Sequence, residues 1–397
     1  MKLAARAGRI VPSPTLAITA TAKAMVAQGL DVVDFASGEP DFDTPEPVKA
    51  AAEAAMRAGF TKYTASSGID ELRLAIAEKL QAEQGLRYDK SQILVSCGAK
   101  HSLYNLAEAL FQAGDEVVIP APFWVSYQDQ IVLNDATPVL LPTQEGDGYA
   151  VHRQALEERV TPRTKAIIVN SPCNPTGATY GRAILEGIAE VALRHDLVII
   201  SDEIYEKIVY DGARHISIAS LGPDVAARTV VINGVSKAYA MTGWRIGYAA
   251  GPKELITAMA NIQSQSTSNP CSISQKAAVA ALRGGDAFPR QMVVEFDRRR
   301  RLMVERLNKI PGVSCRMPAG AFYAFPNVAG VLGKRTRQGP ITAAADLADY
   351  LLKEAVVAVV PGEPFGSANH IRLTYATSTD AIVRGVDRMQ AALEKLT

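Results

Sequence analysis

Lys237 is the side chain of this sequence best suited to covalent chemistry with a carbonyl compound. It ends the segment NGVSK (233–237), where small residues follow an apolar run and leave an ammonium group poorly solvated. Burial lowers the pKa of a lysine and makes its amine nucleophilic toward carbonyls. Arg245 follows eight residues later, within TGWRIGY (242–248). Taken alone, Lys237 also fits a surface loop, so the other segments of the sequence are needed to distinguish a reactive lysine from a surface lysine.

An acid and an amide follow two other apolar runs. Asp202 follows one run after a single serine, and Tyr205 comes three residues later in the segment SDEIYE (201–206). A carboxylate at the end of a buried strand costs free energy unless it is paired or functional, with a helix cap as the alternative. Asn174 lies in NSPCNPTG (170–177), where two prolines stiffen the loop that holds its amide. A stiffened connection without function is the alternative there.

A turn suited to phosphate follows a fourth apolar run. The small residues of SCGAK (96–100) open a predicted helix, so several backbone N–H groups lie at its positive end. Taken alone, this is an ordinary strand-to-helix turn. Together, however, the four segments follow strands, which is where parallel α/β sheets bind ligands. The sequence has no GxxxxGK(S/T), HExxH or GxSxG motif and no GxGxxG in a suitable context, which argues against P-loop, zinc-protease, serine-hydrolase and nicotinamide sites.

Short, purely apolar runs predict the strands that position these segments. Their lack of polar alternation is typical of strands covered on both faces of a mostly parallel sheet. Helical patterns between them, such as 182–195, indicate α/β organisation with crossover helices. Helices are also predicted over 44–59, capped by Thr44, and over 68–85. The predicted strands are Ile93–Val95, Val117–Ile119, Ile167–Val169, Val198–Ile200 and Val230–Ile232.

The two ends of the chain differ from this central pattern. The first forty or so residues are irregular and rich in proline, and we expect them to wrap onto another part of the structure. After about residue 285, short strands and helices alternate, which predicts a second, smaller α+β domain. Its predicted elements are a long charged helix over 290–309, strands near 322–325, 356–360 and 371–375, and helices over 341–353 and 379–395.

Composition excludes several classes of protein. The 397 residues are 48% hydrophobic and 21% charged, as in an ordinary globular enzyme. Lys plus Arg is 42 and Asp plus Glu is 41, so the net charge of +1 does not favour a nucleic-acid or anionic-membrane partner. The four arginines at 298–301 are expected to form a solvated helix surface rather than a nucleic-acid contact.

Cysteine usage and the absence of targeting signals predict a cytoplasmic protein. The four cysteines lie far apart without a CxxC pair, which argues against a disulfide framework or a zinc site and fits a reducing compartment. No metal is expected. Arginines and prolines interrupt the N-terminal stretch, and no apolar run is long enough to span a bilayer.

Beyond these features, the sequence resembles fold-type I, class I pyridoxal-phosphate-dependent aminotransferases. NSPCNPTG (170–177), SDEIYE (201–206) and VSKAYAMTGWRIGY (235–248) carry the resemblance. Their order and spacing are similar to the bacterial aspartate aminotransferase branch, subgroup I-gamma or I-beta. Further matches over nearly the whole chain are ASGEPDFDTP (36–45), TKYTASSGI (61–69), PAPFWVSY (120–127), GAFY (320–323), VVPGEPFG (359–366) and IRLTYATS (371–378).

The resemblance implies an α/β, aspartate aminotransferase-like fold in which a large domain with a mostly parallel sheet carries a smaller α+β domain. It implies pyridoxal 5'-phosphate as cofactor and ping-pong transfer of an amino group from an L-amino acid, most directly aspartate, to a 2-oxo acid such as 2-oxoglutarate. An aminotransferase for aromatic or neutral amino acids, or a C–S β-lyase, stays open. The domains expected are an N-terminal segment over 1–45 that packs with the small domain and active site, a large cofactor-binding domain over 46–285, and a small domain over 286–397.

The resemblance also implies how matching residues treat the cofactor ring. Lys237 would link covalently to the cofactor aldehyde and then move the substrate proton. Asp202 would pair with the ring nitrogen and keep it protonated, while Asn174 and Tyr205 would hydrogen-bond the phenolic oxygen. Trp124 would stack on the ring. Lys237, Asp202 and Tyr205 are thus the expected catalytic residues.

The phosphate would be held by the turn and by two side chains. Gly98, Ala99 and Lys100 would offer main-chain donors, and Ser236 and Arg245 would contribute side-chain donors.

The substrate and a second subunit complete the expected site. Arg372 would bind the α-carboxylate through a bidentate pair, with Gly38, Trp124 and Asn174 close to the substrate. Tyr63 would reach the phosphate of the neighbouring subunit, which implies a homodimer with shared active sites.

Two positions depart from the family pattern. Some relatives that handle dicarboxylic acids or prephenate carry Lys or Arg just before the N-terminal Pro-Ser segment, whereas this sequence has Val11. This weakens the expectation of a dicarboxylate substrate and makes prephenate less expected. Gly234 stands where many relatives have Ser, so one phosphate contact is expected to be missing.

Overall fold

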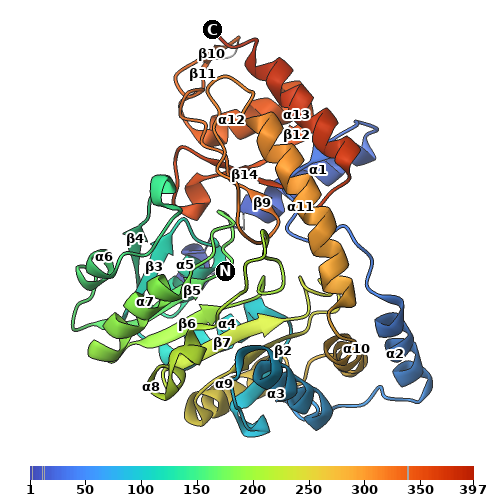
Figure 1. The fold of residues 1–397 in the computed structure, drawn as a ribbon, viewed down its shortest axis with the longest axis vertical. Coiled ribbons are helices and arrows are strands. Elements are labelled where there is room, and N and C mark those ends of the chain that lie inside the picture. The colour runs from blue at the N-terminus through green and yellow to red at the C-terminus, as the bar shows by residue number, and fades with distance from the viewer. Residues whose placement is uncertain (2, 11, 13, 338) are drawn as a thin grey trace.

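The centre of the larger part of the molecule is a seven-stranded sheet in the order β2-β8-β7-β6-β5-β3-β4 (Figure 1). The computed structural model describes residues 1, 3–10, 12, 14–337 and 339–397, so Val11 lies outside the described residues. All neighbouring strands run parallel except β8, which is antiparallel to both β2 and β7. The strands are β2 (Ile93–Ser96), β3 (Glu116–Ala121), β4 (Thr137–Pro142), β5 (Thr164–Asn170), β6 (Val198–Asp202), β7 (Thr229–Gly234) and β8 (Gly247–Ala250). The mostly parallel sheet and its five predicted strands are confirmed.

Helices cover both faces of this sheet, which explains why its strands are uniformly apolar. Ile168 and Ile200 pack against α4 and α9 on one face, whereas Ile167 and Ile199 pack against α7 on the other. Successive residues of a strand point to opposite faces, so each strand residue is buried in one layer or the other. The helices of this part are α2 (Glu46–Arg57), α3 (Asp70–Gln84), α4 (Ala99–Leu110), α5 (Ser126–Leu133), α6 (Arg153–Glu157), α7 (Arg182–Arg194), α8 (Pro223–Ala226), α9 (Lys253–Ser266) and α10 (Ser272–Arg283).

The predicted cap of α2 is wrong. The helix begins at Glu46 after an extended Pro45, and Thr44 makes no capping hydrogen bond. The Thr44 hydroxyl instead donates to the Ala240 carbonyl (2.7 Å) and accepts from Trp244 Nε1 (2.9 Å). Thr44 therefore fastens the start of α2 to the loop that follows Lys237.

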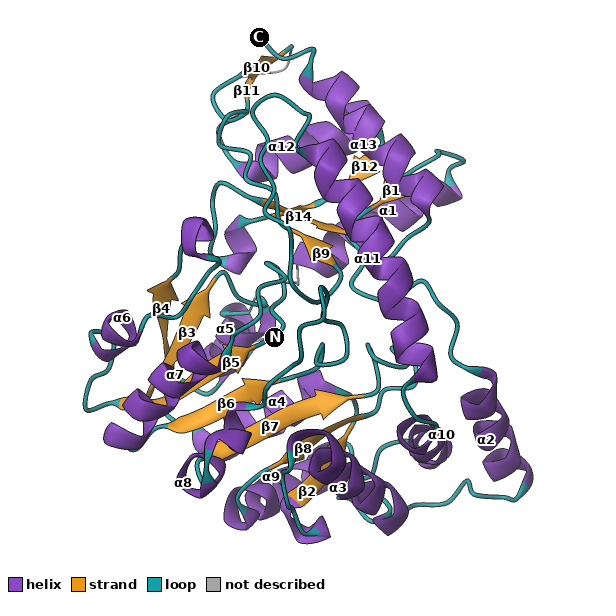
Figure 2. Cartoon of the chain, viewed as in Figure 1, coloured by secondary structure: helices purple, strands orange, loops and turns teal. Residues whose placement is uncertain are grey.

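The smaller part is built on an antiparallel sheet in the order β13-β14-β9, with α11, α12 and α13 beside it (Figure 2). The predicted α+β character is confirmed. A π-helical segment, Leu351–Ala355, continues α12. The other elements are β9 (Tyr323–Ala324), β10 (Arg335–Thr336), β11 (Gly339–Pro340), β12 (Val357–Ala358), β13 (Val360–Pro361), β14 (Ile371–Thr374), α11 (Ala287–Leu307), α12 (Ala344–Tyr350) and α13 (Thr379–Leu393).

The N-terminal segment pairs with a strand of the smaller part. Strand β1 (Val33–Asp34) pairs in parallel with β12, with Val33 opposite Val357. The expectation of an irregular segment is wrong, because residues Pro14–Ala27 form helix α1. A proline at the first position does not interrupt a helix, since the N–H at that position has no partner within the helix. The expected domain boundaries at residues 45 and 285 stay predictions.

The arginine run on α11 is only half solvated. Arg298 and Arg301 are exposed as predicted, but the exposed fractions of Arg299 and Arg300 are 8% and 0%. The expectation of a solvated surface is therefore wrong for these two residues.

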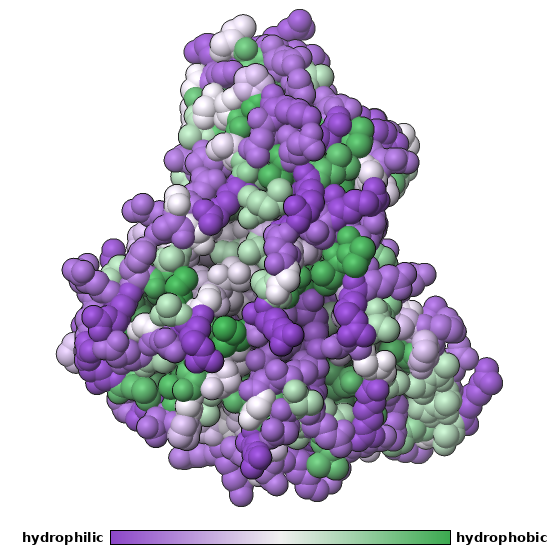
Figure 3. Space-filling model, in the orientation of Figure 1, coloured by the Kyte–Doolittle hydropathy of each residue, from purple (hydrophilic) through white to green (hydrophobic). Residues whose placement is uncertain are grey.

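The surface of the molecule is mixed in character. The face drawn in Figure 3 is largely hydrophilic, with smaller hydrophobic groups between. Within the ranges that the structure describes, no helix is long and apolar enough to cross a membrane.

Candidate active site

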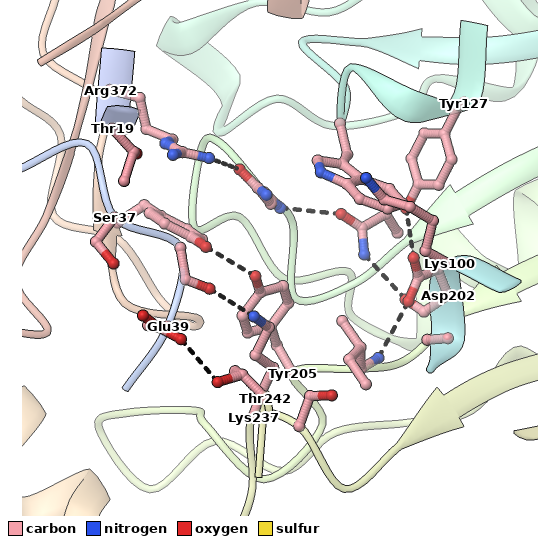
Figure 4. Close-up of a pocket in the computed structure, with 18 of the residues that line it drawn as sticks. Thr19, Ser37, Glu39, Lys100, Tyr127, Asp202, Tyr205, Lys237, Thr242 and Arg372 are labelled. Carbon is pink, nitrogen blue, oxygen red and sulfur yellow. Dashed lines mark hydrogen bonds between the residues drawn. The ribbon is translucent and has the colours of Figure 1, made fainter. Parts of the chain in front are cut away.

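Most of the predicted site residues converge on one cavity of about 400 Å³ at the carboxyl ends of the central strands (Figure 4). Gly98 and Tyr63 are not among the residues that line it, and Tyr63 is 91% exposed. The predicted residues in its wall are Gly38, Ala99, Lys100, Trp124, Asn174, Asp202, Tyr205, Ser236, Lys237, Arg245 and Arg372.

Lys237 projects into the cavity from the loop after β7. Its Nζ donates to the carbonyl oxygen of Gly38, a residue 199 positions earlier in the chain. Burial lowers the pKa of Lys237 to about 8, although the nearby Glu39 carboxylate opposes the shift. A lysine with this pKa has far more neutral, nucleophilic amine near neutral pH than an ordinary lysine.

Asp202 ends β6, and its carboxylate is buried in the cavity wall. The Tyr127 hydroxyl donates to Asp202 Oδ2 (2.6 Å), and the N–H of Ile204 donates to Oδ1 (3.2 Å). Burial raises the pKa of Asp202 to about 6, and the hydrogen bond from Tyr127 opposes that rise. The site therefore holds an acid that is largely ionised at neutral pH and is oriented by two donors.

Arg372 lies in β14 on the opposite side of the cavity (Figure 4). Its Nη1 donates to Asn174 Oδ1 (3.0 Å), its Nη2 donates to the Ala36 carbonyl (2.9 Å), and it lies 4.4 Å from the centre of the Tyr323 ring. Its Nε is buried without a hydrogen-bond partner among the described residues. An almost fully buried guanidinium needs an anion or further acceptors, and a bound carboxylate would provide them.

Aromatic side chains close the cavity between these groups. The hydroxyls of Tyr205 and Tyr323 are 2.9 Å apart and hydrogen-bonded. The Trp124 ring packs edge-on against Tyr127, with ring centres 5.3 Å apart, and Lys100 Nζ lies 4.9 Å from the Trp124 ring. Flat rings at this depth suit a planar ligand.

Gly98 allows the side chain of Arg245 to approach the start of α4. Gly98 has φ +89°, and a Cβ on it would lie 2.4 Å from Arg245 Nη2. The Gly98 N–H donates to the Ser96 carbonyl (2.7 Å), whereas Ala99 and Lys100 open the helix at the cavity. The first N–H groups of a helix have no intrahelical acceptor, so the positive end of α4 and Arg245 together suit a phosphate.

The glycine at 234 has a packing reason. A Cβ there would lie 2.9 Å from both Gly247 Cα and the Ile246 carbonyl, where β7 meets β8. A serine there would require this backbone to shift, and glycine fits the close approach of the two strands.

Sequence reasoning missed several residues of the cavity wall. Tyr127 and Tyr323 belong to the quoted segments PAPFWVSY and GAFY but received no role. Their partners, Asp202 and Tyr205, are 75 and 118 positions away, so no local pattern could pair them. The other missed residues are Thr19, Lys23, Ser37, Glu39, Asn170, Ile204 and Thr242.

Comparison with known proteins identifies the family. The family model for aminotransferase class I and II matches residues 30–388. The chain is a class I and II aminotransferase. It is 48% identical over 397 residues to the aspartate aminotransferase of Geobacillus stearothermophilus, with 99% of each chain covered. It is 49% identical to the aspartate/prephenate aminotransferase of Cereibacter sphaeroides, with 96% of each covered.

A solved structure agrees with this assignment. The crystal structure of the aspartate aminotransferase from Rhizobium meliloti matches this aminotransferase with a TM-score of 0.96 and 48% identity, covering 100% of both chains. The predicted fold, a large domain with a mostly parallel sheet and a smaller domain, is thereby confirmed.

The cofactor of this family, pyridoxal 5'-phosphate, suits the residues of the cavity. An aldehyde needs an amine with a lowered pKa, a pyridine nitrogen needs a buried anion, and a phosphate needs cations and free N–H groups. Lys237 offers the amine, Asp202 offers the anion, and Arg245 with the first N–H groups of α4 offers the phosphate site, all around a single cavity.

Replacing Tyr127 by phenylalanine should shift the pH dependence of cofactor binding by the aminotransferase. Without the Tyr127 hydroxyl, the pKa of Asp202 rises above its value of about 6, so protonation removes the anion at a higher pH. A hydrogen bond to a charged group is strong enough to move the acid limb upward by roughly one pH unit. The dissociation constant of the cofactor, measured across the weakly acidic range for both proteins, checks this. Identical pH midpoints of cofactor binding for the two proteins would contradict the role of Asp202 as the anion that holds the cofactor.

Proposed function

We propose that this aminotransferase moves the amino group of L-aspartate to 2-oxoglutarate. The observation that carries the proposal is the charge of the cavity, in which cationic side chains outnumber the carboxylates of Glu39 and Asp202 among the described residues. Apart from Lys237, whose amine the cofactor would take up, the cationic residues are Lys23, Lys100, Arg245 and Arg372. A phosphate dianion together with a dicarboxylic substrate would use this positive excess. The names of the three relatives above, each of which includes aspartate, support the same substrate.

In the proposed reaction, the chain's residues bind, orient and move protons around the cofactor. When bound, the cofactor's protonated ring accepts the electron pair left when the amino acid loses its Cα proton. Asp202 holds the positive charge of the ring nitrogen with its ionised carboxylate, while Asn174 and Tyr205 donate to the phenolic oxygen. Lys237 carries the covalent link and then, as a neutral amine, accepts the Cα proton at Nζ.

The proposed phosphate site is the start of α4 with two side chains. Ala99 and Lys100 offer main-chain N–H groups, and Ser236 and Arg245, which also line the cavity, offer side-chain donors. Gly98 contributes by leaving room for Arg245. Trp124 supplies the face on which the ring stacks, and its proposed role is supported by its position beside Tyr127.

The proposed assembly is a homodimer with shared sites. Tyr63 projects from the surface with 91% of its area exposed, which is unusual for an aromatic side chain and supports a contact with a second copy. We propose that it reaches the phosphate site of that copy. The proposed compartment is the cytoplasm, supported by four cysteines that are all described by the structure and all free.

Replacing Arg372 by lysine should raise the KM values of the amino donor and of the 2-oxo acid together, by roughly 100-fold. A lysine keeps one positive charge, but it cannot form the planar two-bond pair with the α-carboxylate or keep both contacts to Asn174 and Ala36. Steady-state kinetics with both substrates checks this. KM values within threefold of wild type would contradict the proposed role of Arg372.

A screen of amino donors tests the proposed function. Each amino acid is mixed with purified holoenzyme while the absorbance of the cofactor and the released 2-oxo acid are measured. The proposal expects the largest kcat/KM with aspartate, and oxaloacetate as its product. A preference for aromatic or neutral amino acids would overturn the substrate assignment. Acceptor-independent release of pyruvate and ammonia from a sulfur amino acid would indicate the β-lyase instead.

A further inference from the structure

Helix α11 carries two buried arginines that the proposed chemistry does not use. Arg299 and Arg300 are 8% and 0% exposed, while their neighbours Arg298 and Arg301 are exposed. Removing a guanidinium from water is costly unless acceptors surround it. The acceptors of these two residues therefore show what they hold in place.

Arg299 holds the Gly38 loop, which we define as residues 38–42. Its Nη1 donates to both carboxylate oxygens of Asp41, at 2.8 and 2.9 Å, and its guanidinium lies 5.5 Å from the centre of the Phe42 ring. At the other end of the loop, Gly38 accepts a hydrogen bond from Lys237. A shift of Asp41 would thus move Gly38, which lines the cavity beside Lys237.

Arg300 holds the Tyr323 strap, which we define as residues 318–323. Its Nη1 donates to the Pro318 carbonyl (2.6 Å), and its Nη2 donates to Asp211 (3.0 Å). The guanidinium also lies 4.3 Å from the centre of the Tyr210 ring. Arg300 therefore joins the start of the strap to a second segment, residues 205–211, which we call the Tyr205 segment.

The Tyr323 strap and the Tyr205 segment each carry one tyrosine of the cavity wall. Their backbones are hydrogen-bonded, from the Tyr210 N–H to the Ala319 carbonyl (3.1 Å) and from the Ala321 N–H to the Ile208 carbonyl (2.9 Å). Tyr205 begins its segment and Tyr323 ends the strap. The hydroxyls of these two tyrosines are hydrogen-bonded to each other in the cavity. Arg300 thus binds the two segments at the ends that lie away from the Tyr205–Tyr323 hydrogen bond, and the segments position that hydrogen bond.

We propose that Arg299 and Arg300 are positioning residues, through which one helix sets two walls of the substrate site. Arg299 holds the Gly38 loop against Lys237, and Arg300 holds the Tyr323 strap beside Tyr205. Figure 1 shows α11 extending from the smaller part of the molecule toward the larger one, which suits a helix that ties segments of both. The kinetic consequences rest on the proposed function, whereas the structural ones do not.

Amide hydrogen exchange on the holoenzyme tests the structural consequence. Arg299→Gln should raise exchange in the Gly38 loop by about tenfold or more and leave the Tyr323 strap unchanged, and Arg300→Lys should do the reverse. Arg298→Gln, which changes an exposed arginine of the same run, should alter neither segment. Equal rises in both segments for both variants, or no rise in either, would overturn the proposal. If Arg300→Lys does not fold, Asp211→Asn removes the negative charge of its half-exposed partner and should loosen the strap alone.

Kinetics of the Asp41–Arg299 pair tests the consequence for the site. Arg299→Gln should raise the KM of the amino donor by roughly tenfold with less than a threefold change in kcat, and Arg299→Lys should restore part of the loss. Asp41→Asn should give the same effect, and the double variant should be no worse than either single one, because both changes break one contact. Additive effects, or unchanged KM values, would overturn the proposal. A wild-type enzyme inactive toward aspartate would overturn the proposed function instead and leave the exchange result standing.

Discussion

Replacing Lys237 by alanine is expected to lower kcat by roughly 10⁴-fold or more, because the covalent link and the proton carrier are lost together. The geometry offers no substitute at that position. Lys100 Nζ lies over the Trp124 ring, on another wall of the cavity, while Lys237 Nζ is fixed by the Gly38 carbonyl. The lowered pKa of Lys237, about 8, also distinguishes it from an exposed lysine.

The Lys237 experiment needs a control for folding and one for chemistry. Lys353→Ala, which removes an exposed lysine paired with Asp349, should keep normal kcat. A small primary amine added to Lys237→Ala should restore part of the rate, because a free amine can replace the missing proton carrier. Normal transamination by Lys237→Ala in amine-free buffer would contradict the assignment.

Replacing Asp202 by asparagine is expected to lower kcat by roughly 10³-fold while leaving the cofactor bound. Asparagine keeps the shape of the side chain beside Tyr127 and Ile204 but removes the negative charge that we propose faces the ring nitrogen. Without that charge the ring nitrogen loses its proton more easily and accepts electron density less well.

The Asp202 prediction is checked by measuring kcat and the amount of cofactor per protomer in the same preparation. Asp224→Asn, an exposed carboxylate at the start of α8, serves as the matched control and should behave as wild type. A kcat within threefold of wild type for Asp202→Asn would show that the carboxylate does not act on the ring.

The sequence predicted the central strands because burial on both faces leaves a local mark. Runs such as Ile167–Val169 alternate between two helix layers, so every residue is apolar. Strand β8, Gly247–Ala250, has no such mark, because small residues are required there. A Cβ on Gly247 would lie 2.1 Å from the Ala99 N atom. Edge strand β4 contains two prolines and is largely exposed, so it resembles a loop.

The site was predictable where chemistry follows from residue type and segment, and not where it follows from distant contacts. Lys237, Asp202 and Arg372 came from segments that resemble the family. Tyr127 acts on Asp202 across 75 positions, and no periodicity reports that distance. The burial of Arg300 depends on Pro318 and Asp211, which are 18 and 89 positions away from it, so the local pattern suggested a solvated surface.

Borohydride reduction of the holoenzyme followed by peptide mass mapping tests the central claim most directly. Reduction makes the bond between cofactor and amine permanent, so the modified residue can be read from the peptide that carries it. The structure predicts one cofactor adduct per protomer on the peptide containing Lys237, and none on the peptides containing Lys23 or Lys100. An adduct on another lysine, or no adduct at Lys237, would contradict the account of this site.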